Sequence, residues 1–367
     1  MEGFIAIDCG KYATKVATYN TEEKTVNKFS FRTKTSTGDF ADDALEHNTF
    51  IIQIGDQVYK IGNGAMDEAE LETSKATDIH KNCTLAAIAM SIPATKESIP
   101  VNVAVGIPAK EWCVIEKRQQ LKEYLLPDGD ITIKIKTKSD KPVEEKHFHI
   151  VSKYIFAESV GALFLDKMEE YVDCSVGVID IGNLNINGTI WDDFEISKKD
   201  TITDELGGNI LIAGLTQELS AEFSRCSESY IAKILTLSPD QRKLVRNGIR
   251  DEELEKGSKK MIDTYLLQHV KKIRRRLDSK SWPLDFMPLC FIGGTSKLLA
   301  NEIYSVFGER VYIPDNPEYA NVLGFLRLLC GKRLNLVIPT HTTSKQPEKK
   351  EASNSTNKEN KAEQKTA

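Results

Sequence analysis

Two short stretches of the chain place an aspartate and a glycine directly after an apolar run. The first, IAIDCGKYATK, spans Ile5–Lys15, and the second, VGVIDIGNLNINGTIW, spans Val176–Trp191. A strand that ends in Asp-x-Gly and then turns back presents a row of backbone N–H groups, which bind phosphate oxygens without side-chain help. Glycine lets a phosphate approach the backbone closely. Each stretch therefore predicts a phosphate-binding turn at the end of a strand.

The aspartates of these turns, Asp8 and Asp180, cannot contact phosphate directly, because like charges repel. A carboxylate beside a phosphate can hold a hydrated Mg²⁺ instead, since this ion prefers oxygen ligands and keeps several waters. Lys15 would add a positive point charge near the phosphates. One such sequence alone is typical of an ordinary turn. Two copies, each opening one half of the chain, predict duplicated lobes that hold one triphosphate from both sides.

Two diglycines follow the second aspartate turn. CFIGGTSKLL predicts a buried strand, a close approach of a base or ribose at Gly293 and Gly294, and a helix start capped by Thr295 or Ser296. ELGGNIL places Gly207 and Gly208 where a loop meets a helix, whose N–H groups can face a nucleotide. A strand-to-helix turn that uses glycine only for its geometry is the alternative.

The composition limits the possible classes of protein. The chain has 367 residues and a formal net charge of −5, which argues against a protein wrapped wholesale around nucleic acid. Its seven cysteines are scattered singly, which favours reduced thiols over a zinc or redox motif. No segment resembles a signal peptide, and no apolar run approaches the ~18 residues of a membrane span. We expect a soluble, cytoplasmic protein.

The pattern of apolar residues predicts the elements that position the turns. In the first half we expect a hairpin meander from Phe4, a helix over Cys83–Ile92, a strand over Val101–Pro108 and helices over 109–126 and 156–171. In the second half we expect a hairpin over 176–191, helices over 207–223 and 263–280, and a strand at 287–294 that leads into a helix. Residues from about Thr340 onwards have almost no apolar side chains, so disorder is predicted there.

A run of cations, HVKKIRRRL, lies within the expected helix over 263–280. Val270, Ile273 and Leu277 are spaced to form one buried stripe, which leaves the lysines and arginines on a solvated face. No helix-turn-helix or aromatic platform accompanies them, so direct DNA binding is not expected.

The motifs resemble those of the actin-like ATPases, which include actin, the bacterial shape protein MreB, sugar kinases and heat-shock chaperones. DCGKYATK and DIGNLNINGT are similar to the two phosphate motifs, GGTSKLL to the adenosine motif, and PEYANVLGFLRL to the C-terminal helix motif. VGIPAKEW, AESVGAL and DELGGNIL are shared most closely with ParM-type plasmid-segregation proteins. The resemblance covers roughly residues 4–335.

The resemblance assigns roles to particular residues. It implies that Asp8 and Asp180 hold Mg²⁺ through water, that Glu158 positions the attacking water, and that Glu158 and Asp180 are catalytic. The residues that it implies for nucleotide contact are Asp8, Gly10, Lys11, Tyr12, Ala13, Lys15, Gly182, Asn183, Leu184, Asn185, Gly207, Gly208, Gly293, Gly294 and Thr295. The second turn departs from the family pattern at Asn183 and Asn185, which leaves the role of a threonine hydroxyl there in doubt.

The resemblance also implies fold, activity and partners. It predicts an α/β, actin-like two-lobed fold with duplicated ribonuclease-H-like domains and a nucleotide cleft between them. The expected division is 1–170 for the first lobe, with a small insertion at about 30–85, 171–338 for the second lobe, and 339–367 for a disordered polar tail. The implied activity is hydrolysis of ATP or GTP with Mg²⁺, coupled to filament assembly. The implied partners are further copies of the chain and a DNA-binding, ParR-like adaptor on a plasmid centromere.

Two alternatives stay open on the sequence alone. The first is a sugar or acetate kinase on the same fold, which would need a carboxylate base facing a substrate pocket. The second is a scaffold of the MreB or FtsA type. Such scaffolds commonly carry an amphipathic membrane-binding helix at one end, and the sequence shows none.

Overall fold

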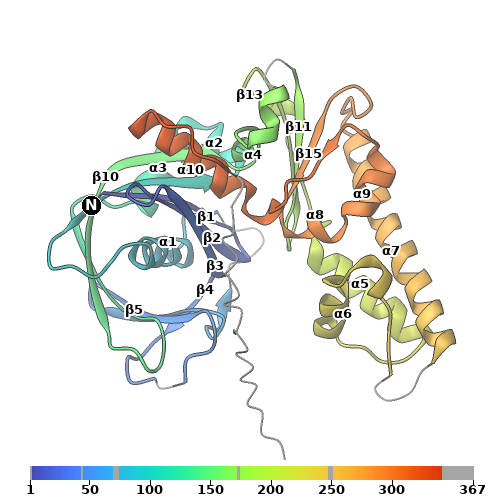
Figure 1. Ribbon diagram of the computed structural model, residues 1–367, viewed down its shortest axis with the longest axis horizontal. Helices are drawn as coiled ribbons and strands as arrows, with labels where there is room; N and C mark the ends of the chain where they lie inside the picture. The colour runs from blue at the N-terminus through green and yellow to red at the C-terminus, as the bar shows by residue number, and fades with distance from the viewer. Residues whose placement is uncertain (1, 43, 69–73, 172–173, 247–250, 341–367) are drawn as a thin grey trace, which may run out of the picture.

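The computed structural model describes residues 2–42, 44–68, 74–171, 174–246 and 251–340. Within these ranges the chain forms two lobes, each built on its own sheet (Figure 1). The first lobe contains mostly strands, and the second carries several helices on one side of a smaller sheet.

The first lobe holds a sheet of ten strands in the described part of the chain, in the order β3-β2-β1-β8-β10-β9-β5-β6-β4-β7. In chain order the strands are β1 (Gly3–Cys9), β2 (Ala13–Asn20), β3 (Thr25–Arg32), β4 (Lys34–Thr37), β5 (Thr49–Ile54), β6 (Gln57–Gly62), β7 (Asp67–Glu68), β8 (Ile99–Ile107), β9 (Asp130–Lys136) and β10 (Glu144–Ala157). β1 and β2 form an antiparallel hairpin, and β8 runs parallel to β1 on its other side.

The sheet curls around helix α1 (Asp78–Met90), which lies inside the first lobe (Figure 1). The Thr77 side chain caps the helix by accepting a hydrogen bond from the N–H of His80. All residues from Asn82 to Ala89 are buried. The predicted buried helix over Cys83–Ile92 is confirmed, with its start five residues earlier.

The remaining helices of the first lobe differ from the sequence prediction. The expected helix over 109–126 is divided into α2 (Ala109–Trp112) and α3 (Ile115–Leu125), with Cys113 as the C-cap of the first. The expected helix over 156–171 was wrong, because β10 continues to Ala157 and only α4 (Val160–Leu163) and the 3₁₀ helix η1 (Asp166–Tyr171) follow.

The last helix, α10 (Ala320–Leu334), returns from the second lobe and packs on β1, β2, β8 and α4 of the first. Two glycines allow this approach, since a Cβ added to Gly324 would lie 1.9 Å from the Gly161 carbonyl oxygen. The lobe is therefore built from both ends of the chain. The expected division into residues 1–170 and 171–338 places α10 with the second lobe, and that division stays a prediction.

Among the residues that the structure describes, the second lobe holds a six-stranded sheet in the order β13-β12-β11-β15-β16, with β14 paired to β12. Its strands are β11 (Val176–Ile181), β12 (Ile186–Asp192), β13 (Glu195–Ile196), β14 (Ile202–Asp204), β15 (Leu289–Ile292) and β16 (Val311–Tyr312). Its helices are η2 (Lys198–Asp200), α5 (Gly208–Glu222), α6 (Glu228–Leu235), η3 (Pro239–Gln241), α7 (Glu252–Asp278), α8 (Gly294–Leu298), α9 (Ala300–Phe307) and η4 (Pro317–Tyr319).

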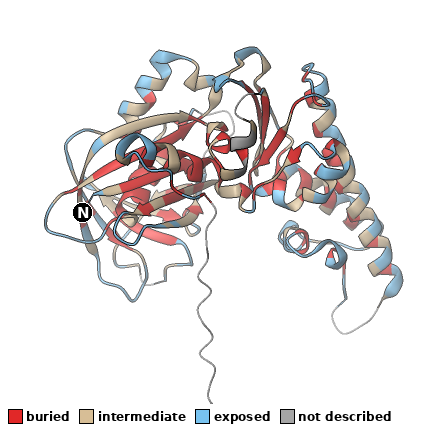
Figure 2. Cartoon of the chain, turned by 45° about the horizontal axis from the view of Figure 1, so that its top comes forward, coloured by how far each residue is buried: buried red, intermediate tan, exposed pale blue. Residues whose placement is uncertain are grey.

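Buried residues concentrate in the two sheets and on the inner faces of the helices (Figure 2). On α7 the stripe of Val270, Ile273 and Leu277 is fully buried, as predicted. Two cations of its outer face pair within the chain, Arg274 with Asp285 and Arg276 with Asp204. All seven cysteines are free, as expected from their single spacing.

The end of the described chain contacts the body of the protein. Thr340 is buried, and its N–H donates to the Asp166 carboxylate at 3.1 Å. The expectation of disorder was therefore wrong for Thr340, and the rest of that prediction, over 341–367, lies outside the described residues. Within the described residues, no helix combines the length and apolar character needed to cross a membrane.

Candidate functional site

The two Asp-x-Gly sequences form turns of the same shape, one in each lobe. The Gly10 N–H donates to the Ala13 carbonyl oxygen at 3.2 Å, and the Gly182 N–H donates to the Asn185 carbonyl oxygen at 2.9 Å. In each case a Cβ on the glycine would lie 3.1 Å from that same oxygen. Each turn joins the first two strands of its lobe's hairpin, and each first strand has a parallel neighbour, β8 or β15.

The side chains around the first turn carry positive charge. Asp8 is buried at the end of β1 and lies opposite Lys15 on β2. Its Oδ2 atom is 3.8 Å from the Lys15 ammonium, and its Oδ1 atom is 3.5 Å from the Lys75 ammonium. Both oxygens of this carboxylate therefore face cations.

The side chains around the second turn carry no such charge. Asp180 lies opposite Asn187 on β12, and within the described residues it has no ion pair. Its Oδ2 atom accepts a hydrogen bond from the Asn321 amide at 3.3 Å. Burial raises the pKa of Asp180 to about 6; Lys15 opposes this shift, and the negative charges of Asp8 and Glu158 add to it.

Glu158 lies at the end of β10, and its N–H donates to the Ile107 carbonyl oxygen of β8 at 2.7 Å. This position corrects the predicted helix. The chain reverses at Ser159, whose φ of +80° is rare for a residue with a side chain. Such a conformation persists only where the surroundings hold it. Here the Ser159 N–H donates to the Asn321 side-chain oxygen at 2.9 Å, and its hydroxyl shares a hydrogen bond of 2.7 Å with Thr189.

Asn321 thus connects the two halves of the site. It lies on α10 and is buried, and its amide contacts Asp180 of the second lobe while its oxygen holds the residue after Glu158. The sequence analysis included Asn321 in a motif but gave it no role. An asparagine has both a donor and an acceptor, which is what this bridge requires.

A small cavity lies between the lobes against Glu158 and Asp180. Its volume is about 50 Å³, and its other lining residues are Pro108, Ala109, Lys110, Ser159, Asn187, Gly188, Thr189, Thr201, Ile202 and Thr203. A water molecule needs about 10–15 Å³ of such space and two or more polar partners. The cavity therefore has room for water directly beside both predicted catalytic carboxylates.

The predicted diglycine Gly207–Gly208 supports the second turn from behind. The N–H groups of Gly208 and Asn209 donate to the carbonyl oxygens of Gly182 and Asn183, at 3.0 and 2.7 Å. These two helix N–H groups hold the turn itself. A Cβ on Gly207 would lie 2.5 Å from the Leu184 carbonyl carbon, so only glycine allows this approach.

The other diglycine contacts the same turn. Gly293 has a φ of +89°, and a Cβ there would lie 2.3 Å from the Asp180 carboxylate. Thr295 donates its hydroxyl hydrogen to the Gly182 carbonyl oxygen at 2.9 Å. Gly294 differs, because the atom nearest to a Cβ at this position is 3.9 Å away, on Glu318. Of the two glycines, Gly294 is the one with space beside it for a ligand.

Arg32 on β3 contacts the first turn at Tyr12. The Arg32 guanidinium lies over the Tyr12 ring, 3.7 Å from its centroid, and Arg32 Nε donates to the Tyr12 carbonyl oxygen at 3.1 Å. Glu68 pairs with Arg32 and Lys34. Nucleotide contact by Tyr12 stays a prediction, and no sequence pattern indicated its stacking with Arg32.

Lys75 is the main site residue that the sequence analysis missed. Its side chain is 2% exposed, pairs with Glu158, and donates to the Gly106 carbonyl oxygen at 3.2 Å. Burial alone would lower the pKa of this ammonium, but Glu158 and then Asp8 outweigh burial and raise it, so Lys75 is charged. A single lysine in TSKATD, just before a helix, has no pattern that indicates this role.

The donor set suits a magnesium ion bound together with phosphates. Asp8 and Asp180 offer carboxylate oxygens from opposite lobes, and among the described residues no group of three or more His, Cys, Asp or Glu gathers as a metal site. Mg²⁺ is usually held by one or two carboxylates plus phosphate oxygens and water, without a complete protein cage. The residues present fit that type of site.

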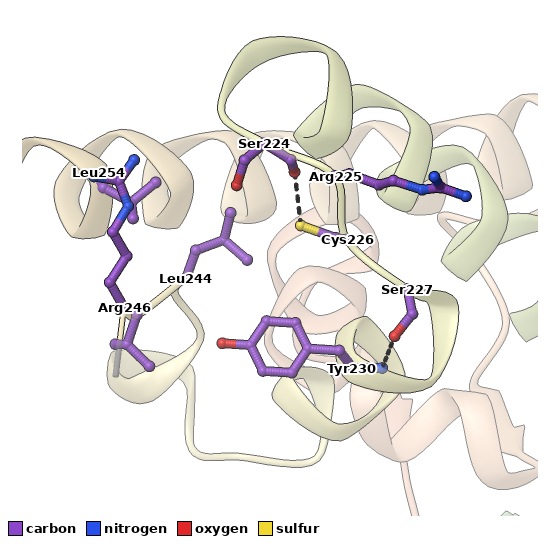
Figure 3. Close-up of a pocket in the computed structure, with 9 residues that line it drawn as sticks. Ser224, Arg225, Cys226, Ser227, Tyr230, Leu244, Arg246 and Leu254 are labelled. Atoms are coloured by element: carbon purple, nitrogen blue, oxygen red, sulfur yellow. Dashed lines mark hydrogen bonds between the residues drawn. The ribbon is translucent and has the colours of Figure 1, made fainter. Parts of the chain in front are cut away.

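A larger cavity lies elsewhere. It measures about 550 Å³ and is found in the second lobe, between the loop that joins α5 to α6 and the residues before and at the start of α7 (Figure 3). Leu244 and Leu254 contribute its apolar side chains, and Arg246 and Tyr230 flank it. None of the predicted site residues lines it.

Residues 6–161 match the family model for the N-terminal domain of actin-like proteins. The chain has the actin-like fold, and the predicted fold class is confirmed. Among proteins with curated functions, none matches closely enough to be called a relative.

Similar solved structures include actin homologues and ParM proteins, in line with the predicted resemblance. An Alp12 filament has 22% identity and a TM-score of 0.67, covering 90% of this chain and 99% of its own. An archaeal actin homologue, Ta0583, has 14% identity and a TM-score of 0.73, covering 89% and 98%. A 15-stranded ParM filament from Clostridium botulinum has 18% identity and a TM-score of 0.63, covering 89% and 99%.

Proposed function

We propose that the protein is an actin-like ATPase that assembles into filaments when it binds a nucleoside triphosphate. The observation that carries this proposal is the arrangement of three carboxylates. Asp8 and Asp180 end the matched strands of the two lobes, and Glu158 shares a water-sized cavity with Asp180. Phosphoryl transfer to water needs positioning and charge neutralisation more than covalent chemistry, and this arrangement offers both.

The roles of the residues follow from their places. The backbone of the two turns, Gly10–Ala13 and Gly182–Asn185, would hold the phosphates from opposite sides, with Lys15 as a nearby positive charge. A Mg²⁺ ion held by Asp8 and Asp180 through water would neutralise charge that develops on the phosphates. Glu158 would orient the attacking water and accept its proton. Gly294 would leave room for the ribose or base.

The kinase alternative would need a substrate pocket beside a carboxylate base. The cavity beside Glu158 measures about 50 Å³, which gives room for a water molecule. This supports water as the acceptor of the phosphoryl group.

Filament assembly is supported by the similarity to an Alp12 filament and to a ParM filament. The plasmid role is the finer part of the proposal, and it is supported by the resemblance to ParM-type proteins. In this role the filament would move DNA through a ParR-like adaptor. The nucleotide would be ATP or GTP.

The test is sedimentation of the full chain with Mg²⁺ and ATP, GTP, ADP or no nucleotide, with phosphate release followed in parallel. We expect a pellet and phosphate release with a triphosphate, and neither in EDTA. Absence of both under every condition would overturn the proposal. Nucleotide consumption that appears only after a hexose or acetate is added would instead support a kinase.

The plasmid role needs a separate test in cells. Two tagged copies of the DNA that encodes the protein should move apart when the parent chain is present, and should stay together with the Asp180→Ala variant. Separation at the same rate with both proteins would remove the plasmid role and leave the ATPase proposal standing.

A further inference from the structure

Lys75 provides a cation where the proposed function requires a metal. Its ammonium is enclosed by three oxygen ligands: the Glu158 carboxylate, Asp8 Oδ1 at 3.5 Å, and the Gly106 carbonyl oxygen at 3.2 Å. Carboxylate and carbonyl oxygens are also the ligands that hard divalent ions prefer. The second oxygen of Asp8 faces Lys15 at 3.8 Å, so a divalent ion that approaches Asp8 meets two positive charges.

We propose that Lys75 is an internal cation that competes with the divalent metal ion for Asp8 in the nucleotide-free protein. This inference rests on the proposed function, since it assumes that Asp8 takes part in metal binding. Because like charges repel strongly in a partly buried site, the metal alone binds weakly while Lys75 is in place. A bound nucleotide changes this competition. Its phosphates supply negative charge that can pair with the metal ion and with both Lys15 and Lys75.

The same contact gives Lys75 a positioning role toward Glu158. In the nucleotide-free site the Glu158 carboxylate is occupied by Lys75, and it becomes available to water when the ammonium turns toward the phosphates. Metal entry and release of Glu158 would then be one event. Lys75 acts here through two carboxylates, so it is a positioning residue.

The test measures binding of Mn²⁺ alone, without nucleotide, from the electron paramagnetic resonance signal of the free ion. The Lys75→Met variant should bind Mn²⁺ at least about tenfold more tightly than the parent, because one positive charge a few ångströms from a divalent ion is removed. In EDTA the same variant should bind ATP more weakly. Tighter Mn²⁺ binding together with weaker ATP binding would indicate an effect of the lysine charge. A cleft loosened by the substitution would instead weaken the binding of both Mn²⁺ and ATP.

Lys146→Met is the matched control. Lys146 is also a buried lysine of the first lobe, and it donates to the Ile92 carbonyl oxygen at 3.0 Å and pairs with Glu144 at 2.7 Å. Its loss should leave Mn²⁺ affinity unchanged. If Lys75→Met fails to fold, Lys75→Gln removes the same charge and keeps an amide that can donate to Glu158.

Unchanged or weaker Mn²⁺ binding by the Lys75 variants overturns the inference, as does a lack of Mn²⁺ binding by parent and variants alike. The measurement uses no nucleotide, so it is read independently of ATP hydrolysis and assembly. A parent that neither hydrolyses ATP nor sediments would remove the proposed function, while tighter Mn²⁺ binding by Lys75→Met would still show the competition.

Discussion

The first lobe surrounds its aspartate with cations, whereas the second lobe gives its aspartate one amide. Asp8 has Lys15 and Lys75 within 4 Å, and Asp180 has the Asn321 amide. The backbone of the two turns is the same, down to the hydrogen bond that closes each one. The two turns therefore share their backbone geometry, while the side chains around them differ in charge.

This difference divides the chemistry between the lobes. Asp8 is neutralised by Lys15 and by Lys75, which also pairs with Glu158, so phosphates that approach the first turn meet lysines near it and no unpaired carboxylate. Asp180 faces the cavity beside Glu158, where the lining also includes hydroxyls and an amide. We infer that the first turn mainly serves nucleotide binding, and that the second serves the hydrolytic step.

The largest expected effect comes from Glu158, which lies where the lobes meet. Glu158→Ala should lower phosphate release by about 10²-fold or more, the usual range for loss of a general base. ATP binding and assembly should remain, because neither uses the attacking water. After limiting ATP is added, light scattering of the parent should rise and decay, and that of the variant should rise and stay.

Glu145→Ala is a control on the same strand, since Glu145 pairs with His147 far from the turns. It should behave like the parent. Unchanged phosphate release by Glu158→Ala would remove Glu158 from the mechanism and with it the proposed division between the lobes. Slow release with normal decay of the scattering would separate hydrolysis from filament turnover.

The two aspartates should differ in their effects on stability. Breaking a buried ion pair on one side commonly costs about 3–5 kcal/mol. Lys75 keeps Glu158 as a partner, so we expect Asp8→Asn to cost about 2 kcal/mol. Asp180→Asn removes a charge that burial disfavours, so the free energy of unfolding should stay equal or rise by up to about 1 kcal/mol.

Urea unfolding in EDTA measures both variants without metal or nucleotide. Equal losses would show that the two turns have the same electrostatics in solution, against the contacts described here. With Mg²⁺ present, both variants should lose nucleotide binding. If the Asp180→Ala variant binds and hydrolyses ATP like the parent, the site has been assigned to the wrong cleft.

A smaller effect is expected from one buried histidine in each lobe. Burial lowers the pKa of His80 to about 3, with Lys75 and Lys11 adding to the shift. Burial also lowers the pKa of His269, partly offset by its contact with the Leu206 carbonyl oxygen. Below the ordinary histidine pKa of about 6.5, the unfolded chain therefore binds more protons than the folded protein. The stability from each neutral histidine is present above that pH and is lost as pH falls.

The measurement is the free energy of unfolding between pH 7 and pH 5. For His80 we expect a loss approaching about 1.4 kcal/mol per pH unit below the unfolded pKa. His80→Gln should flatten this slope more than His269→Gln. The exposed residue His47 provides the matched control for the substitution itself, as His47→Gln. A parent-like slope in His80→Gln would show that His80 becomes protonated without cost in the folded protein.

Much of this comparison could be predicted from the sequence, because it depends on local signals. An apolar strand followed by Asp-x-Gly indicates the turn, and two copies indicate the duplication. The periodic apolar residues of α7 predicted its buried stripe, and the apolar run Cys83–Ile92 predicted α1.

The contacts made across the chain could not be predicted in this way. Lys75, Asn321 and Ser159 meet the turns only after α1, α10 and β10 have packed, and their sequence neighbours show no pattern for it. The helix expected over 156–171 failed for a related reason: β10 pairs with β8 up to Ala157, so tertiary pairing overrides the local helical spacing.

The smallest expected effect concerns the end of the chain, which completes the first lobe and has no counterpart in the second. Ile338 is buried, and the Thr340 hydroxyl donates to Asp166 at 2.9 Å. Deletion of 341–367 should change the free energy of unfolding by no more than about 0.5 kcal/mol, as for surface changes, and should leave ATPase activity intact. Deletion of 338–367 should cost about 1–3 kcal/mol, because it removes a buried apolar side chain and leaves Asp166 without this partner. Thermal unfolding and phosphate release of the two truncated chains provide the measurement.

A large loss of stability already in the shorter deletion would show that 341–367 docks on the body. If the shorter deletion abolishes only adaptor binding, residues 341–367 are a partner-binding segment, and the first lobe is stable without them.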